Sequence, residues 1–164
     1  RYQYYFVKNS FLSVNGDSGS TWFPKLFRVP SLTINCIHPI LNYPIRENEF
    51  CVMQKISKNN DILNIDDFLG EEGIQNPKNP TLYKYEPHTQ NDFLSIFEKV
   101  IKRVLDKDYT HSNEEKIIRL KVKEKIDLLS NANKGSIHHN PYMHKWSDKN
   151  FNGNGIFLKD NLIN

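Results

Sequence analysis

The stretch from Leu32 to Phe68, LTINCIHPILNYPIRENEFCVMQKISKNNDILNIDDF, decides the fold of this chain. Residues 32–37 and 50–56 both have the pattern in which every second side chain shares a face, which is typical of β-strands. Beyond a polar turn, apolar side chains recur at helical spacing, and this helix is predicted to open at Asp61. The stretch therefore predicts two strands and a helix within a small α+β core.

The second half of the chain carries clear helix signals. Thr89 with Asp92, and Ser112 with Glu115, have the spacing of capping boxes at helix N-termini. Apolar side chains recur at helical spacing after each box, which predicts two helices within residues 88–135. Because the link between them is short, the helices are expected to pack as an antiparallel hairpin.

The whole chain is predicted to be α+β, with a small antiparallel sheet, packed helices, a C-terminal helical hairpin and extended arms. Its 164 residues suffice to bury a core. Residues 81–86, bracketed by two prolines, are expected to supply a third strand. The predicted segments are an N-terminal aromatic arm at 1–22, the α+β core at 23–87, the helical hairpin at 88–135 and an extended tail at 136–164.

Both ends of the chain look like arms. Aromatic residues alternate through residues 2–7, which predicts a strand or an extended arm, followed by a loop that begins at Asn15-Gly16. These rings either stack on RNA bases or line a core or a neighbouring protein, and we favour the second use. The tail is polar apart from an apolar run at residues 156–158, which is typical of an arm ordered by docking. Such arms indicate a fixed component of a larger complex.

Composition limits the kinds of protein to which this chain can belong. The chain has 22 basic and 19 acidic residues and a formal net charge of +3, a balance that permits RNA contact without demanding it. No run of about 18 apolar residues occurs, so no integral membrane segment is predicted. Cys36 and Cys51 both fall in the strand patterns, and we expect two buried thiols in a reducing compartment, with a cross-strand disulfide as the alternative.

Motifs that suggest chemistry are few. Residues 16–19, Gly-Asp-Ser-Gly, resemble the nucleophile segment of trypsin-like proteases, but no histidine precedes His38 to activate the serine. A loop that packs on a partner explains His138, His139 and His144 better than zinc does, because both cysteines lie far upstream. A solvated helix end explains the acidic group Asp66, Asp67, Glu71 and Glu72. We therefore predict no enzyme activity, no catalytic residue, no metal, no cofactor and no small-molecule substrate.

The spacing of residues in the deciding stretch is similar to a known family. In that family a Pro closes the first strand, and a second Pro and a Phe follow at fixed intervals. An apolar-x-apolar strand, a hydroxyl and basic pair, and a helix that opens with Asp come next. Those positions here are Pro39, Pro44, Phe50, Val52, Ile56, Ser57 with Lys58, and Asp61 with Ile62. By this pattern the chain resembles the mitochondrial branch of the universal large-subunit ribosomal protein twenty-three family, although His38 stands where the family has arginine.

The resemblance implies a structural constituent of the large subunit of an organellar ribosome, in the mitochondrial matrix or, as the alternative, in a plastid. It implies a sheet with helices on one face, bound to ribosomal RNA and neighbouring ribosomal proteins near the nascent-chain exit, where chaperones or membrane insertases dock. An alternative function is that of a lineage-specific accessory subunit of a mitochondrial respiratory or ATP synthase complex.

Candidate RNA contacts are basic residues in two places. Some flank the matched strands, and others lie on the second predicted helix, whose basic face either meets phosphates or is simply solvated. These candidates are Lys25, Arg28, Lys55, Lys58, Lys121 and Lys123.

Overall fold

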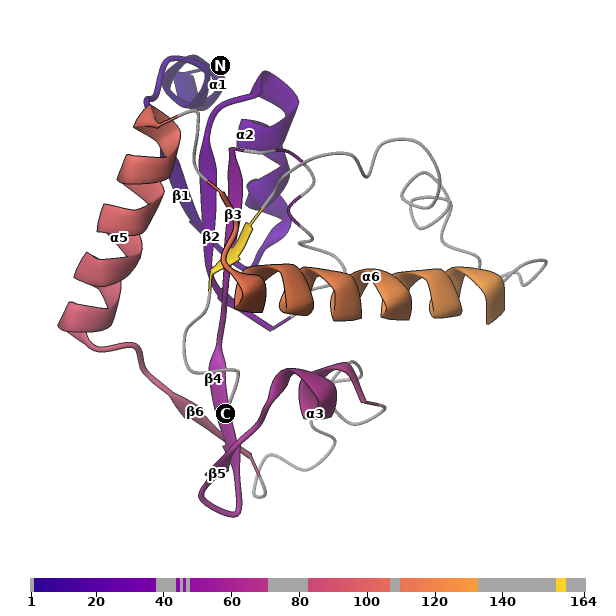
Figure 1. Cartoon of the computed structure of the whole chain (residues 1–164). Helices are drawn as coiled ribbons and strands as arrows, with labels where there is room; N and C mark the ends of the chain where they lie inside the picture. The colour runs from indigo at the N-terminus through magenta and orange to yellow at the C-terminus, as the bar shows by residue number, and fades with distance from the viewer. Residues whose placement is uncertain are drawn as a thin grey trace.

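The α+β class is confirmed, and the strands divide between two sheets (Figure 1). The computed structural model describes residues 2–37, 44, 46, 48–70, 83–106, 110–132 and 156–158. In chain order the elements are α1 (Tyr2–Lys8), β1 (Ser13–Gly16), the short 3-10 helix η1 (Gly19–Thr21), α2 (Trp22–Phe27), β2 (Ser31–Cys36), β3 (Glu49–Met53), β4 (Lys55–Lys58), β5 (Asp61–Ile62), α3 (Ile65–Leu69), β6 (Tyr83–Glu86), α5 (Gln90–Leu105), α6 (Asn113–Ala132) and β7 (Ile156–Leu158).

The larger sheet has the strand order β1-β2-β3-β7, and all its neighbouring strands run parallel. Its strand β3 is buried along its whole length. Phe50 and Val52 of β3 pack in a cluster with α5, whereas Cys51 and Met53 pack in a second cluster with α6. Since successive side chains of a strand point to opposite faces, both faces of the sheet are covered, as is usual for parallel strands. The structure thus differs from the arrangement implied by the family resemblance, with helices on one face.

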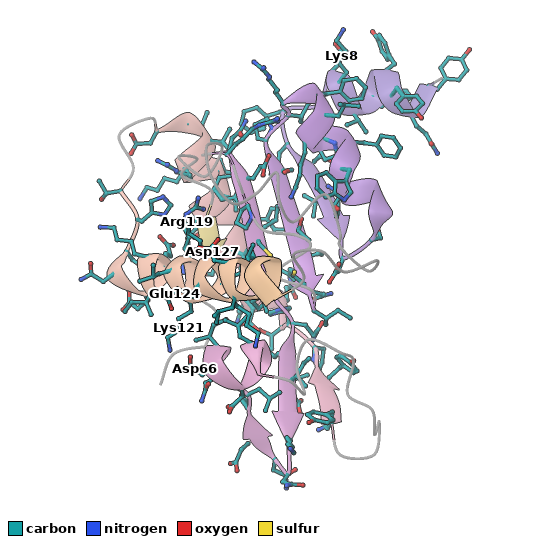
Figure 2. All side chains as sticks on the ribbon, turned by 90° about the vertical axis from the view of Figure 1, so that its right-hand side faces the viewer. Lys8, Asp66, Arg119, Lys121, Glu124 and Asp127 are labelled. Atoms are coloured by element: carbon teal, nitrogen blue, oxygen red, sulfur yellow. The ribbon has the colours of Figure 1, made fainter. Side chains whose placement is uncertain are left out.

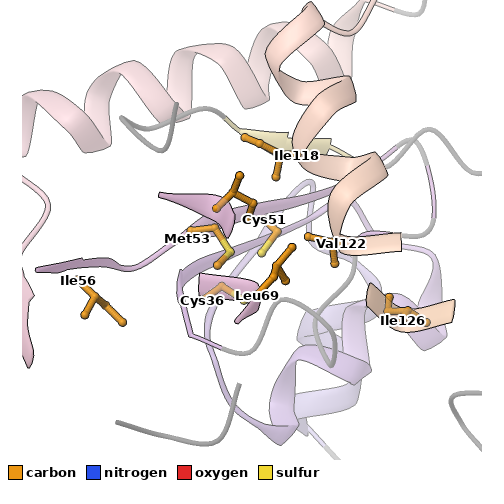
Figure 3. Close-up of a cluster of buried hydrophobic side chains, with 9 residues drawn as sticks. Cys36, Cys51, Met53, Ile56, Leu69, Ile118, Val122 and Ile126 are labelled. Atoms are coloured by element: carbon orange, nitrogen blue, oxygen red, sulfur yellow. The ribbon is translucent and has the colours of Figure 1, made fainter. Parts of the chain in front are cut away.

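The cluster on the α6 side joins both sheets to two helices (Figure 3). It contains Cys36, Cys51, Met53, Ile56, Ile65, Leu69, Ile118, Val122 and Ile126. Full burial of an aliphatic side chain stabilises a fold by about 1.5–3 kcal/mol, so this cluster fixes α6 and α3 in place. Its two cysteines are free thiols, which confirms the prediction of two buried thiols and excludes the disulfide between them.

The predicted antiparallel sheet is present as the smaller sheet, with strand order β5-β4-β6. Its strand β6 confirms the third strand within residues 81–86. The run at residues 50–56, predicted as one strand, is divided at Gln54 into β3 and β4, which belong to different sheets. The backbone N–H of Gln54 donates to the carbonyl of Cys36 at 2.9 Å, and its side-chain amide donates to the carbonyl of Glu86 at 2.8 Å. This one residue is therefore bonded to both sheets.

Both predicted capping boxes are present. The Thr89 N–H donates to Asp92 Oδ2 at 2.7 Å, and the Asp92 N–H donates to Thr89 Oγ1 at 3.2 Å. The N–H groups and side chains of Ser112 and Glu115 make the same exchange at 2.9 and 3.2 Å. The helices that follow, α5 and α6, cover opposite faces of the sheet because their buried residues belong to different clusters. In Figure 1, α5 stands upright at the left and α6 runs across the view, so the two do not lie side by side as the expected antiparallel hairpin.

The predicted strand or extended arm at the N-terminus is wrong, because residues 2–8 form the helix α1. In this helix Tyr4 packs edge-on against two rings of α2, with ring centroids 5.2 Å from Phe23 and 6.3 Å from Phe27. The segment also lacks the regular exchange of apolar and polar side chains that marks a half-buried strand, because Tyr4, Tyr5, Phe6 and Val7 follow one another without a charged residue. Asn15 and Gly16, predicted to open a loop, instead end β1.

Two further segments differ from expectation. Asp61 does not open a helix. It lies in β5 and pairs with Lys58 of β4, and α3 begins at Ile65 after the capping box of Asn64. In the tail, residues 156–158 form β7, which pairs with β3 of the same chain. The apolar run of the tail therefore docks on the chain's own sheet, while residues 136–155 and 159–164 lie outside the described residues.

Candidate interaction surface

An aromatic surface covers the N-terminal helices. We use this name for the exposed side chains of α1 and α2, which are Tyr2, Tyr4, Tyr5, Phe6, Trp22, Phe23 and Leu26. Figure 2 shows α1 at one end of the molecule with aromatic side chains projecting outwards. Monomeric proteins rarely expose contiguous apolar patches of more than a few hundred Å², and larger ones mark interaction sites.

The helix α1 has two distinct sides. Tyr4 faces α2, as its ring contacts show. Tyr2, Tyr5 and Phe6 stand at positions i, i+3 and i+4, which share one side of a helix. Their exposed fractions are 82%, 66% and 69%, and the rings of Tyr5 and Phe6 lie 6.0 Å apart. One side of α1 therefore anchors the helix, and the other presents three rings to the surroundings.

The charge on this surface has one sign. The sequences of α1 and α2, YQYYFVK and WFPKLF, contain no Asp or Glu. Lys8 ends α1 and is exposed, and Arg28 follows α2 and is also exposed. The surface therefore combines aromatic rings with positive charge, which suits an apolar partner with negative charge at its edge.

The predicted RNA contact Lys25 is directed inwards. Its side chain is 7% exposed, its Nζ lies 3.8 Å from Glu49 Oε2, and it stands 5.3 Å from the centroid of the Trp22 ring. Arg46 donates to the carbonyl of Lys25, and its Nη1 lies 3.9 Å from Glu49 Oε1. This ion-pair group connects α2 to the first residue of β3 and so fixes the base of the aromatic surface.

The side chains of Lys55 and Lys58 also make contacts within the chain. Lys55 Nζ lies 3.1 Å from Asp92 Oδ2 and so links β4 to the start of α5. Lys58 Nζ stands 5.4 Å from the centroid of the Tyr83 ring in β6. The first contact joins the smaller sheet to α5, and the second joins two neighbouring strands within that sheet.

The Asp92 carboxylate gives the start of α5 a pH-dependent stability. The N–H of Thr89, followed by the Lys55 ammonium, lowers the pKa of Asp92 from 3.8 to about 2. A lowered pKa means that the charged carboxylate stabilises the fold above the unfolded pKa, and that this contribution is lost as the pH falls through about 2.

Asp92→Asn is therefore expected to lower the thermal unfolding midpoint at neutral pH. The difference from the unchanged protein should shrink between about pH 4 and pH 2, as the carboxylate of the latter takes up its proton. Unfolding curves recorded across this range measure the effect, and a difference that stays constant would contradict it. Thr89→Ala, which removes the other half of the capping box, is expected to cost about 1 kcal/mol.

On α6, Lys121 is bonded to Asp66 of α3, and Figure 2 shows the two lying opposite each other. Lys123 is half-buried. The six predicted RNA contacts therefore lie in three places, on α2, β4 and α6, and do not form one basic surface. Arg28 is the exposed member of the set.

The motifs weighed for chemistry have structural roles where the structure describes them. Asp17 of the Gly-Asp-Ser-Gly segment accepts a hydrogen bond from the N–H of Ile37 at 2.7 Å, which ties the segment to the end of β2. Asp66 and Asp67 lie in the first turn of α3. Among the described residues no group of three His, Cys, Asp or Glu side chains could hold a metal. His138, His139 and His144, together with Glu71 and Glu72, lie outside the described residues.

The outer side of α1 is the feature that sequence reasoning missed. Tyr2, Tyr5 and Phe6 have helical spacing, but Tyr2, Tyr4 and Phe6 in the same segment fit the alternation of a strand. No protein-family model, curated protein or solved structure matches this chain.

In the described part of the chain, no helix has both the length and the apolar character that crossing a bilayer requires.

Proposed function

We propose that this chain is a non-catalytic structural constituent of the large subunit of a mitochondrial ribosome. The observation that carries the proposal is the aromatic surface on α1 and α2, because so many exposed rings on two adjacent helices are expected to be covered by a partner. The identity of the assembly rests on the family resemblance in residues 39–58.

Density-gradient sedimentation of the tagged protein in an organelle lysate tests this proposal. The protein is expected to co-migrate with large-subunit ribosomal RNA, and to shift when magnesium is chelated or RNA is digested. Migration with an RNA-free particle, unaffected by either treatment, would overturn the ribosomal assignment. Migration as a free protein would overturn membership of any assembly.

Arg28 separates an RNA contact from a structural role. It follows α2 with φ 59°, in the left-handed region where glycine is favoured. Arg28→Gly is therefore expected to stabilise the isolated protein by about 1 kcal/mol in urea unfolding. If Arg28 contacts ribosomal RNA, the same variant is expected to incorporate less well into the large subunit. A variant that is more stable and incorporates normally would remove Arg28 from the RNA contacts.

A second candidate function is an accessory subunit of a mitochondrial respiratory or ATP synthase complex. The observation that favours it is the engagement of predicted RNA contacts within the chain, because Lys25 and Lys55 are paired with Glu49 and Asp92. An accessory subunit would need the aromatic surface but no phosphate contacts. The nuclease arm of the sedimentation experiment distinguishes the two functions.

A further inference from the structure

The outer side of α1 is held in place by the contacts of its inner side. Tyr4 holds the opposite side of the helix against Phe23 and Phe27 of α2. The stripe of Tyr2, Tyr5 and Phe6 is therefore presented on a fixed support, so little conformational entropy is lost when it is covered.

We propose that α1 inserts Tyr2, Tyr5 and Phe6 into an apolar groove of a neighbouring protein, and that Asp and Glu side chains line the edge of this groove. Side chains at i, i+3 and i+4 are the anchors by which an amphipathic helix binds a groove. Tyr and Arg are also enriched among the residues that dominate interface energies, and Arg28 lies at the edge of the surface. This inference rests on the proposed function in one respect, that the chain is a fixed subunit of an assembly.

The positive charge near α1 and α2 favours a groove with an acidic edge. The α1 and α2 helices carry no carboxylate. The exposed cation Lys8 ends α1, and the exposed cation Arg28 follows α2. A groove edged with Lys or Arg would meet these cations with like charge, which costs binding energy and slows association. An acidic edge instead attracts them.

The same geometry disfavours RNA and membrane as occupants. Single-stranded RNA binding combines stacking rings with a basic groove that follows the phosphates, whereas α1 carries one cation, Lys8, at its end. Interfacial membrane helices carry a strongly charged polar face, whereas the side of α1 that holds Tyr4 is packed on α2.

Site-specific photo-cross-linking tests the proposal. Benzoyl-phenylalanine replaces Tyr5 in the tagged full chain within its native particle, and a matched chain carries it at Gln3, which is exposed on another side of α1. The Tyr5 probe is expected to give one protein adduct, whose cross-linked peptide maps to an apolar groove flanked by Asp and Glu. The Gln3 probe is expected to give that adduct in much lower yield.

Variants of the probe-bearing chain add a second readout. Tyr2→Ala with Phe6→Ala is expected to lower the adduct yield by about tenfold or more, since a few aromatic anchors carry most of the binding energy of an interface. The thermal midpoint should be unchanged, because these rings are exposed. Lys8→Glu should also lower the yield, most clearly at low salt.

Several outcomes would overturn the inference. They are an adduct with RNA, with lipid or with a second copy of this chain, a groove edged with Lys or Arg, no adduct at all, or equal yields at Tyr5 and Gln3. The gradient position of the same particle reports the proposed function separately. Sedimentation with the large ribosomal subunit together with an RNA adduct defeats the inference alone, whereas an acidic groove found in an RNA-free particle defeats the ribosomal assignment alone.

Discussion

Phe50→Ala is expected to cost about 4 kcal/mol of unfolding free energy, the largest effect of any single truncation discussed for this chain. Phe50 is 2% exposed and lies in β3, an interior strand of the parallel sheet. It packs with Leu32 of β2 and with Ile96 and Val100 of α5. Its removal leaves a cavity on the α5 side, and domains of this size have total stabilities of only about 5–15 kcal/mol. Urea unfolding followed by circular dichroism measures the loss.

Phe6→Ala is the matched control, because it removes the same side chain from a position that is 69% exposed. Its unfolding free energy is expected to change by less than about 0.5 kcal/mol. The two variants therefore separate the fold from the interaction surface, since Phe6 is expected to matter for docking and Phe50 for stability. Equal losses in the two variants would contradict the placement of Phe50 in the core between β3 and α5.

Local signals in the sequence predicted the helices of the second half correctly. The capping boxes at Thr89 and Ser112 depend on residues three apart, so the sequence alone specifies them. How α5 and α6 pack depends on the sheet that lies between them, which no local pattern reports. A short link favours a hairpin, but two helices joined by such a link can also cover opposite faces of one sheet, as α5 and α6 do.

The parallel sheet has a signal in the sequence of β3. Residues 50–53 of β3, Phe-Cys-Val-Met, are apolar without interruption, and this is the pattern of a strand with both faces buried. An alternating strand would have left one face to water. The change of sheet at Gln54 could not be predicted in this way, because it depends on hydrogen bonds to Cys36 and Glu86 far away in the chain.

The composition of the N-terminal segment indicates an aromatic surface, but the sequence does not indicate that a helix presents it. Sequence reasoning assigns the N-terminal rings to a core or a neighbouring protein, and the structure packs Tyr4 against α2 and leaves Tyr2, Tyr5 and Phe6 exposed. The inward orientation of Lys25 and Lys55 could not be foreseen, since their carboxylate partners lie 24 and 37 positions further along the chain, at Glu49 and Asp92.

Glu49→Gln is expected to cost about 3 kcal/mol, because it leaves the buried Lys25 ammonium facing an amide. The two side chains are 3% and 7% exposed, and their charged atoms lie 3.8 Å apart. Lys25→Met should cost less, since Arg46 Nη1 still lies 3.9 Å from the carboxylate of Glu49. Urea unfolding of each variant measures these losses.

The double variant Lys25→Met with Glu49→Gln decides whether the pair acts as a unit. It should be more stable than Glu49→Gln alone, because no buried ammonium then faces the amide at position 49. If the two losses simply add, the residues do not interact as the structure places them, and Lys25 becomes available for contact with RNA again. Raising the salt concentration should change the coupling little, since both groups are shielded from solvent, whereas an RNA contact of Lys25 would weaken steeply. Comparison of the double variant with the two single variants therefore tests the base of the aromatic surface and one of the predicted RNA contacts.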